Sequence, residues 1–162
     1  LESAMIACFE LSPQGDCSDG PHGAIGEWDV ARVTDMSRMF SDANSFNGDI
    51  SKWDVSRPTD MSGMFFQAEA FDGDISNWDV SRVTDMKYMF KGATSFAKTL
   101  CGAKWTGSTA SKTEMFANSQ GKFCGSYVKT ITTRTEPIST TTTRTATHAP
   151  NHNRNPNHRG AS

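Results

Sequence analysis

The sequence lacks the features of several large functional classes. It has no run of 18 apolar residues, the length that a membrane-spanning helix needs, so we expect no membrane span. It has no Cys-x-x-Cys pair and no His/Cys cluster at zinc-ligand spacing, so we expect neither a structural zinc site nor a cofactor. It also has no Ser/His/Asp or Cys/His arrangement for nucleophilic attack. These absences predict a protein that is not an enzyme.

Apolar residues are scarce, above all near the C-terminus. Only 36% of the 162 residues are hydrophobic, and residues 129–162 hold ten Thr, three Pro and three His but no aromatic residue. Such a composition cannot bury enough apolar surface to offset the entropy of ordering, so we expect a disordered Thr-rich tail at 129–162. The tail carries five basic residues and one acid, whereas residues 1–128 carry 11 basic and 17 acidic residues. Five scattered charges without aromatic residues are a poor footprint for nucleic acid, so we expect no such partner.

The four cysteines lie in two pairs, one on each side of the central block. Cys8 and Cys17 precede that block, and Cys101 and Cys124 follow it. This placement predicts two local disulfides, Cys8–Cys17 and Cys101–Cys124. The alternative is four free thiols in a cytosolic protein.

The central block, residues 25–99, consists of three copies of one phrase at an interval of 25 residues. It reads "WDVARVTDM" at 28–36, "WDVSRPTDM" at 53–61 and "WDVSRVTDM" at 78–86. Such a period indicates stacked units, because one short unit cannot cover its own apolar side and must lay it against its neighbours. The constant Trp, Val, Met and Phe positions are then core rather than a sugar-stacking or Met-rich binding surface. A worn fourth copy follows, with Trp105 and the triple Met115-Phe116-Ala117.

Each copy predicts one short strand followed by one short helix. Trp53 and Val55 are two apart, which is the spacing of one strand face. Apolar residues then fall at i, i+3, i+4 and i+7 from Met61, which is a helical stripe. Thr59 stands where an N-cap belongs. The predicted fold class is α/β, with a parallel sheet on one side and a row of short helices on the other.

The unit W-D-V-S-x-V-T-D-M-x-x-M-F-x-x-A-x-x-F-x-x-D-I resembles the repeat of about 25 residues found in bacterial surface proteins. That family includes BspA-like proteins and a mycoplasma-lipoprotein-type domain of unknown function. The resemblance implies a leucine-rich-repeat-like solenoid at the cell surface or outside the cell, with binding or adhesion as its usual role and no established enzymatic activity. Ile50-x-x-Trp53-x-Val55 fits the leucine-rich-repeat core. Where those repeats carry Asn or Cys, this chain has Val33, Pro58 or Val83, so the usual asparagine ladder is missing.

The chain accordingly divides into four parts. We predict an N-terminal cap at 1–24, three repeats at 25–99, a degenerate repeat with a C-terminal cap at 100–128, and the tail at 129–162. The two disulfides hold the caps, which cover the core of the terminal units. In the first cap, Leu1, Met5, Ile6 and Phe9 form a helical stripe.

The predicted binding surface is the exposed sheet face. It combines positions that vary between copies with two constant rows of charge. The variable positions are Glu27, Lys52 and Asn77, and the constant rows are Asp29, Asp54, Asp79 and Arg32, Arg57, Arg82. Equivalent aspartates of neighbouring copies would lie close together and repel one another. An Asp/Arg network, a bound cation or simple solvation could offset this repulsion.

A second row of acids, Asp35, Asp60 and Asp85, is explained by helix starts, where the dipole favours a carboxylate. A glycosidase pair would need two different environments, and identical copies give identical ones. We therefore expect a monomeric binding or adhesion module that recognises a protein or glycan through its sheet face. The alternatives are a structural spacer without a ligand and, more remotely, a secreted glycan or peptide hydrolase.

Overall fold

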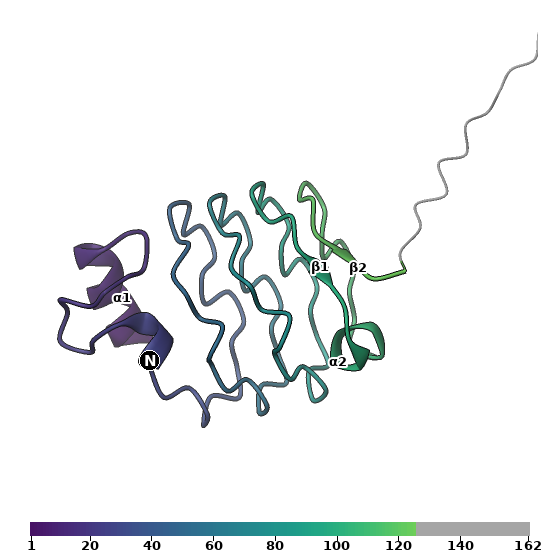
Figure 1. Cartoon of the computed structure of the whole chain (residues 1–162), viewed down its shortest axis with the longest axis horizontal. Coiled ribbons are helices and arrows are strands. Elements are labelled where there is room, and N and C mark those ends of the chain that lie inside the picture. Colours follow the sequence, from purple (N-terminus) through teal and green to yellow (C-terminus); the bar gives the residue numbers. More distant parts are fainter. Residues whose placement is uncertain (126–162) are drawn as a thin grey trace, which may run out of the picture. The chain divides into compact units, whose positions relative to one another are not determined.

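The computed structural model describes residues 1–125, in which a few short helices and strands flank a series of loops. Helix α1 (Glu2–Leu11) opens the chain, and a 3-10 turn follows at Ile25–Glu27. Strand β1 (Thr99–Leu100), helix α2 (Ala103–Thr106) and strand β2 (Lys122–Phe123) close it, with β1 and β2 parallel. Between them the loops of residues 25–99 lie side by side (Figure 1). The tail predicted at 129–162 lies outside the described residues.

Successive copies are joined through their backbones. Parallel bridges link Asp35 to Asp60, Asp60 to Asp85, and Asp85 to Ser111 in the fourth copy. Each bridge is extended by further bonds, such as the Phe40 N–H donating to the Met64 carbonyl at 2.8 Å. Equivalent residues of neighbouring copies therefore lie next to one another, and the worn fourth copy continues the series.

The strand predicted at Trp and Val of each copy is wrong. Among residues 1–125, no backbone hydrogen bond joins neighbouring copies at Trp53–Val55. The side chain makes the connection instead: the Trp53 indole N–H donates to the Ile25 carbonyl at 2.8 Å, and Trp78 donates to Ile50 at 3.2 Å. The alternation of buried residues is real, but the backbone pairs between copies at Asp35, Asp60 and Asp85.

The helix predicted in each copy is also wrong, because a chain of tight turns takes its place. The N–H groups of Met61, Gly63, Phe65 and Gln67 donate to the next copy, while those of the residues between them close local turns. Gly63 and Gln67 have φ of 59° and 54°, in the left-handed region, which breaks any helix. The helical apolar spacing suits this strip equally well, because the same four apolar side chains point inward and the neighbouring copy satisfies the amides.

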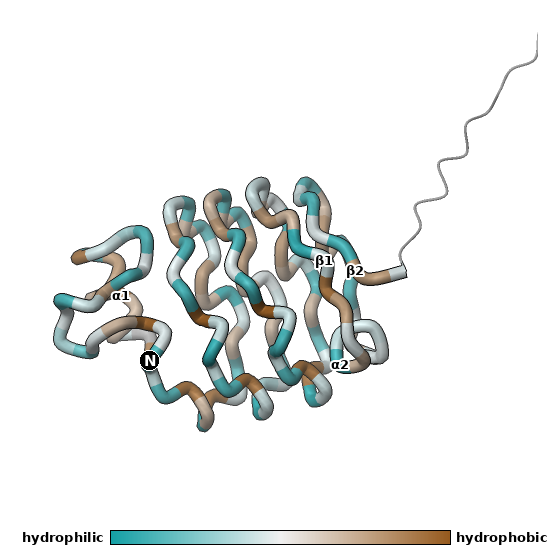
Figure 2. Tube along the Cα trace, viewed as in Figure 1, coloured by the Kyte–Doolittle hydropathy of each residue, from teal (hydrophilic) through white to brown (hydrophobic). Residues whose placement is uncertain are grey.

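The predicted core is confirmed, and it is built from two columns of phenylalanine. Phe65 stacks between Phe40 and Phe90 at centroid distances of 5.2 and 5.4 Å. A second column runs through Phe46, Phe71 and Phe96 with 5.8 Å between neighbours. Figure 2 shows apolar stretches recurring at corresponding places in adjacent loops. Trp53 and Trp78 are only 4% and 2% exposed, so they belong to this core as predicted, whereas Trp28 of the first copy is only partly buried and packs against the core.

The two predicted disulfides, Cys8–Cys17 and Cys101–Cys124, are both present, with Cα atoms 5.1 and 4.9 Å apart. Each fastens one end of the unit. Within residues 1–125, no helix combines the length and the apolar character that crossing a bilayer requires.

Helix α1 covers the first copy, but through a different face from the one predicted. Met5 is buried, and Phe9 meets Phe46 edge-on at 5.7 Å. Ile6 and Leu1 are 57% and 44% exposed, so they do not share the buried face. The helix packs by its Met5, Cys8 and Phe9 side because the disulfide of Cys8 draws that side toward Cys17.

A ladder of side-chain acceptors does exist, although not at the leucine-rich-repeat position. The Asn47 Oδ1 accepts from the Asp72 N–H at 2.9 Å, and the Asp72 Oδ1 accepts from the Ala97 N–H at 3.1 Å. A side chain directly after the second phenylalanine of a copy, Asn47 or Asp72, therefore accepts a backbone hydrogen bond from the next copy, which is the role of asparagine in a leucine-rich repeat.

Candidate binding surface

The constant aspartates of the predicted surface each close a turn of their own loop. Asp54 accepts from the Ser56 N–H at 3.0 Å, and Asp79 accepts from the Ser81 N–H at 3.1 Å. Asp29 does the same with Ala31 at 3.1 Å. These Asx turns give the repeated carboxylate a local structural role.

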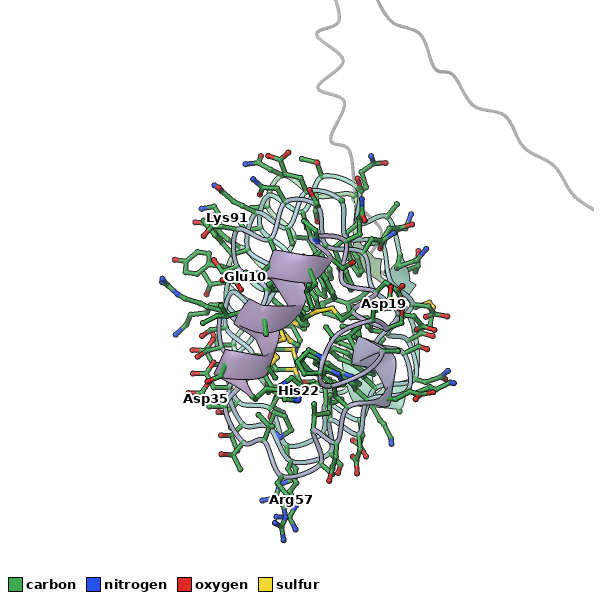
Figure 3. All side chains as sticks on the ribbon, turned by 90° about the vertical axis from the view of Figure 1, so that its left-hand side faces the viewer. Glu10, Asp19, His22, Asp35, Arg57 and Lys91 are labelled. Carbon is green, nitrogen blue, oxygen red and sulfur yellow. A yellow bond between two sulfur atoms is a disulfide. The ribbon has the colours of Figure 1, made fainter. Side chains whose placement is uncertain are left out.

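The Asp/Arg network is not formed. All ion pairs within residues 1–125 use lysine, as in Lys104 to Asp79 at 2.7 Å. Arg32, Arg57 and Arg82 are exposed. Figure 3 shows Arg57 pointing away from the body at its lower tip. A guanidinium in open water gains little from an ion pair, so the turns stabilise the Asp row instead.

The second row of acids also closes turns, rather than starting helices. Asp60 accepts from the Ser62 N–H at 2.7 Å, and Asp85 accepts from the Lys87 N–H at 2.8 Å. A third set that the sequence analysis did not single out, Asp49 and Asp74, accepts from Ser51 and Ser76 at 3.0 Å each.

Such bonds lower the pKa of two aspartates of the first row. Hydrogen bonds from the side chain and then the backbone of Ser56 lower the pKa of Asp54 below its ordinary value. The Lys104 ammonium, followed by Ser81, lowers the pKa of Asp79 to about 2. Over the part of the chain that is described, no three His, Cys, Asp or Glu side chains are grouped so as to hold a metal ion.

The variable positions of the predicted surface are all exposed, but they are not on the bridged segments. Glu27 and Lys52 line one shallow hollow of about 170 Å³, together with Asp49 of the first copy. The structure therefore brings these two together across neighbouring copies. Their role in binding stays a prediction.

A larger hollow of about 520 Å³ lies over the strip of turns and was missed from the sequence. Its lining comes from three successive copies and includes Arg38, Gly63, Phe66, Tyr88 and Lys91. In Figure 3, Lys91 lies on the same side of the molecule as Asp35, away from the Arg57 tip. This side carries cationic, acidic and aromatic groups together.

The hollow exists because one copy lacks a side chain that its neighbours have. Arg38, Gly63 and Tyr88 occupy the same place in copies one, two and three, and all three are left-handed with φ of 54°, 59° and 59°. Glycine leaves a gap between the other two side chains. The alignment of Met-Ser-Arg-Met, Met-Ser-Gly-Met and Met-Lys-Tyr-Met already shows the glycine between two larger residues. Because a helix was expected there, the sequence did not show that these three positions lie side by side on the surface.

Comparison with known proteins gives a family-level match. The family described as "Mycoplasma protein of unknown function, DUF285" matches residues 14–127, which is well over half of the chain. No curated protein and no solved structure matches.

Proposed function

The chain belongs to the DUF285 family, whose description is a Mycoplasma protein of unknown function, and from this premise we propose that it is a binding or adhesion module. We propose further that it acts outside the cell or on the cell surface, and that it is built as a short leucine-rich-repeat-like solenoid of the BspA-like type. Its partner is a protein or a glycan.

One observation carries the proposal: the backbone is repeated while the outward side chains change. Arg38, Gly63 and Tyr88 have nearly the same φ and lie beside buried Met and Phe residues at equivalent positions of their copies, yet they differ completely in chemistry. A frame that carries different side chains at one surface position is suited to recognition, because contacts can change there without disturbing the core. A spacer has no need of a mixed polar and aromatic hollow spanning three copies.

The two disulfides support the proposed location. Neither Cys8–Cys17 nor Cys101–Cys124 binds a metal or lies in a redox motif, and both fasten the ends of the repeated unit. Structural disulfides of this kind persist in oxidising environments such as the cell exterior.

The test is a screen of the complete 162-residue chain against glycan and protein arrays. We expect at least one specific ligand. Hits are then re-measured with a double charge reversal, Glu27→Lys with Lys52→Glu, and with Glu69→Lys as a control at an exposed residue outside both hollows. If the surface at Glu27 and Lys52 is used, only the double variant weakens binding. The absence of any specific ligand on both arrays would support the spacer and overturn the proposal.

A further inference from the structure

The hollow above Gly63 has the size of a small-ligand site. Its volume of about 520 Å³ is in the usual range for such sites. A Cβ placed on Gly63 would lie 3.4 Å from the Arg38 Cγ and 3.6 Å from the Phe66 Cβ. The floor of the hollow is therefore the glycine backbone, and an arginine stem borders it.

Of the cationic side chains that line this hollow, Arg38 is the one that is not in an ion pair with any residue of 1–125. Lys87 pairs with Asp85 at 3.0 Å, and Lys91 pairs with Glu114 at 2.5 Å. The Arg38 guanidinium makes no ion pair or hydrogen bond to residues within 1–125. Its planar fork of N–H donors matches a carboxylate in a two-point contact.

Across the glycine from Arg38 stands an aromatic ring. Tyr88 is 39% exposed, one of few large apolar side chains so open in the described chain. The Lys91 Nζ lies over this ring, 5.1 Å from its centroid, so a ligand would stack on the part of the ring that the ammonium leaves open. The electron-rich face of an exposed ring attracts the slightly positive C–H groups of a pyranose.

The acids of the lining narrow the ligand class. Asp42 and Asp85 both border the hollow, and Asp85 is already paired with Lys87, so Asp42 is the lining carboxylate left to repel an anionic group or to accept a hydrogen bond. A sugar hydroxyl donates to such a carboxylate. A neutral sugar would leave Arg38 without a partner, whereas a sugar with a single carboxylate satisfies the arginine, the ring and Asp42 together.

We propose that this hollow binds a hexuronic acid residue of an acidic glycan. The carboxylate pairs with Arg38 across Gly63, the apolar face of the pyranose lies on Tyr88, and sugar hydroxyls donate to Asp42. The inference rests on the proposed function, and it names the ligand class and the site.

Calorimetry with trigalacturonate tests the carboxylate contact. We expect binding by the complete chain and none, or binding about tenfold weaker, for the methyl-esterified trisaccharide, which has the same shape without the charge. The variant Arg38→Lys keeps the charge but loses the fork, and we expect about tenfold weaker binding. Lys122→Arg, a conservative exchange at an exposed residue of β2 that lines neither hollow, is the control and should bind as the unaltered chain does.

Filling the hollow tests the site itself. Gly63→Tyr places there a residue that Tyr88 already shows to be compatible with the same backbone conformation, and we expect it to abolish binding. Gly63→Asn, which tolerates positive φ, serves if the tyrosine variant is unfolded by circular dichroism. Tyr88→Phe should retain binding and Tyr88→Ala should lose it.

The outcomes separate this inference from the proposed function. If trigalacturonate does not bind, or binds a filled Gly63 variant equally well, while the arrays give another specific ligand, the inference fails and the proposed function stands. If an acidic peptide such as triglutamate binds Arg38 as tightly as the sugar does, the hexuronate assignment is overturned. If nothing binds, both fail.

Discussion

At the scale of single residues, the aromatic columns stabilise the stack of copies. Phe65 is fully buried, lies between Phe40 and Phe90, and packs on Phe71 at a centroid distance of 3.9 Å. Offset-stacked rings gain a little beyond the area that they bury. Because each ring contacts the copies on both sides, removing a central ring opens a cavity that neither neighbour can fill.

We therefore predict that Phe65→Ala lowers the free energy of unfolding by about 3–5 kcal/mol. Phe123→Ala is the control, because this ring is half-buried at the end of the series and touches Phe116 edge-on. It should cost clearly less. Urea unfolding of both variants measures the difference, and equal losses would contradict the role of the central column.

At the scale of elements, the strip of turns replaces the expected helix, and its amides depend on the next copy. The Tyr88 N–H donates to the Thr113 carbonyl at 3.0 Å, and the Phe90 N–H donates to Met115 at 2.8 Å. The corresponding amides of the fourth copy, at Glu114 and Phe116, donate to no residue within 1–125. Protection against exchange should therefore end at the fourth copy.

We predict that the amides of Tyr88 and Phe90 exchange more than about a hundredfold more slowly than those of Glu114 and Phe116, because the latter need no unfolding to reach water. Hydrogen exchange followed by nuclear magnetic resonance measures all four sites at once. A helix in the fourth copy would protect Phe116 through its own turn. If Phe116 were protected as strongly as Phe90, the result would argue against a strip whose amides bond to the next copy.

The Asx turns are a second element-scale device, and they make stability sensitive to acid. Hydrogen bonds from the serine two residues later, Ser56 or Ser76, lower the pKa of Asp54 and of Asp74, and the pKa of Asp79 falls to about 2. A carboxyl whose folded pKa lies below its unfolded value contributes stability above the unfolded value and loses it as the pH falls through the folded one.

We thus predict a thermal midpoint that is constant above about pH 5 and falls between about pH 4 and 2. Asp54→Asn with Asp74→Asn keeps the oxygen acceptor and removes the proton-binding group, so the double variant should lose less stability over the same range. Melting curves by circular dichroism at several pH values measure this. An identical pH profile for both proteins would show that these two carboxylates do not cause the loss of stability in acid.

At the scale of the whole molecule, the ends decide whether the repeated unit holds together. Cys101 and Cys124 are separated by 23 residues, and their disulfide joins the start of the fourth copy to the segment that follows β2. In the chain-entropy model, a disulfide that closes a loop of this size stabilises the folded state by about 3 kcal/mol, which is a large share of the net stability of a small domain.

Replacing both by serine, Cys101→Ser with Cys124→Ser, should lower the free energy of unfolding by about 3 kcal/mol. Unfolding in denaturant checks this, and adding a reductant to the unaltered chain should give at least the same loss. The serine variant retains the Cys8–Cys17 disulfide. Adding reductant to this variant therefore measures how much stability the first disulfide contributes. A loss below about 1 kcal/mol would show that the fourth copy is held by packing alone.

The sequence by itself determined the 25-residue period, and it correctly predicted most of the inward Trp, Met and Phe positions and both disulfide pairings. Burial follows from chemical type and repetition, and short cysteine loops close locally, so these features can be predicted without knowing how the backbones of neighbouring copies are bonded. The tertiary structure alone decided the backbone conformation and the hollow. Each amide of the turn strip finds its partner in the next copy, and the gap at Gly63 has meaning only once Arg38 and Tyr88 lie beside it.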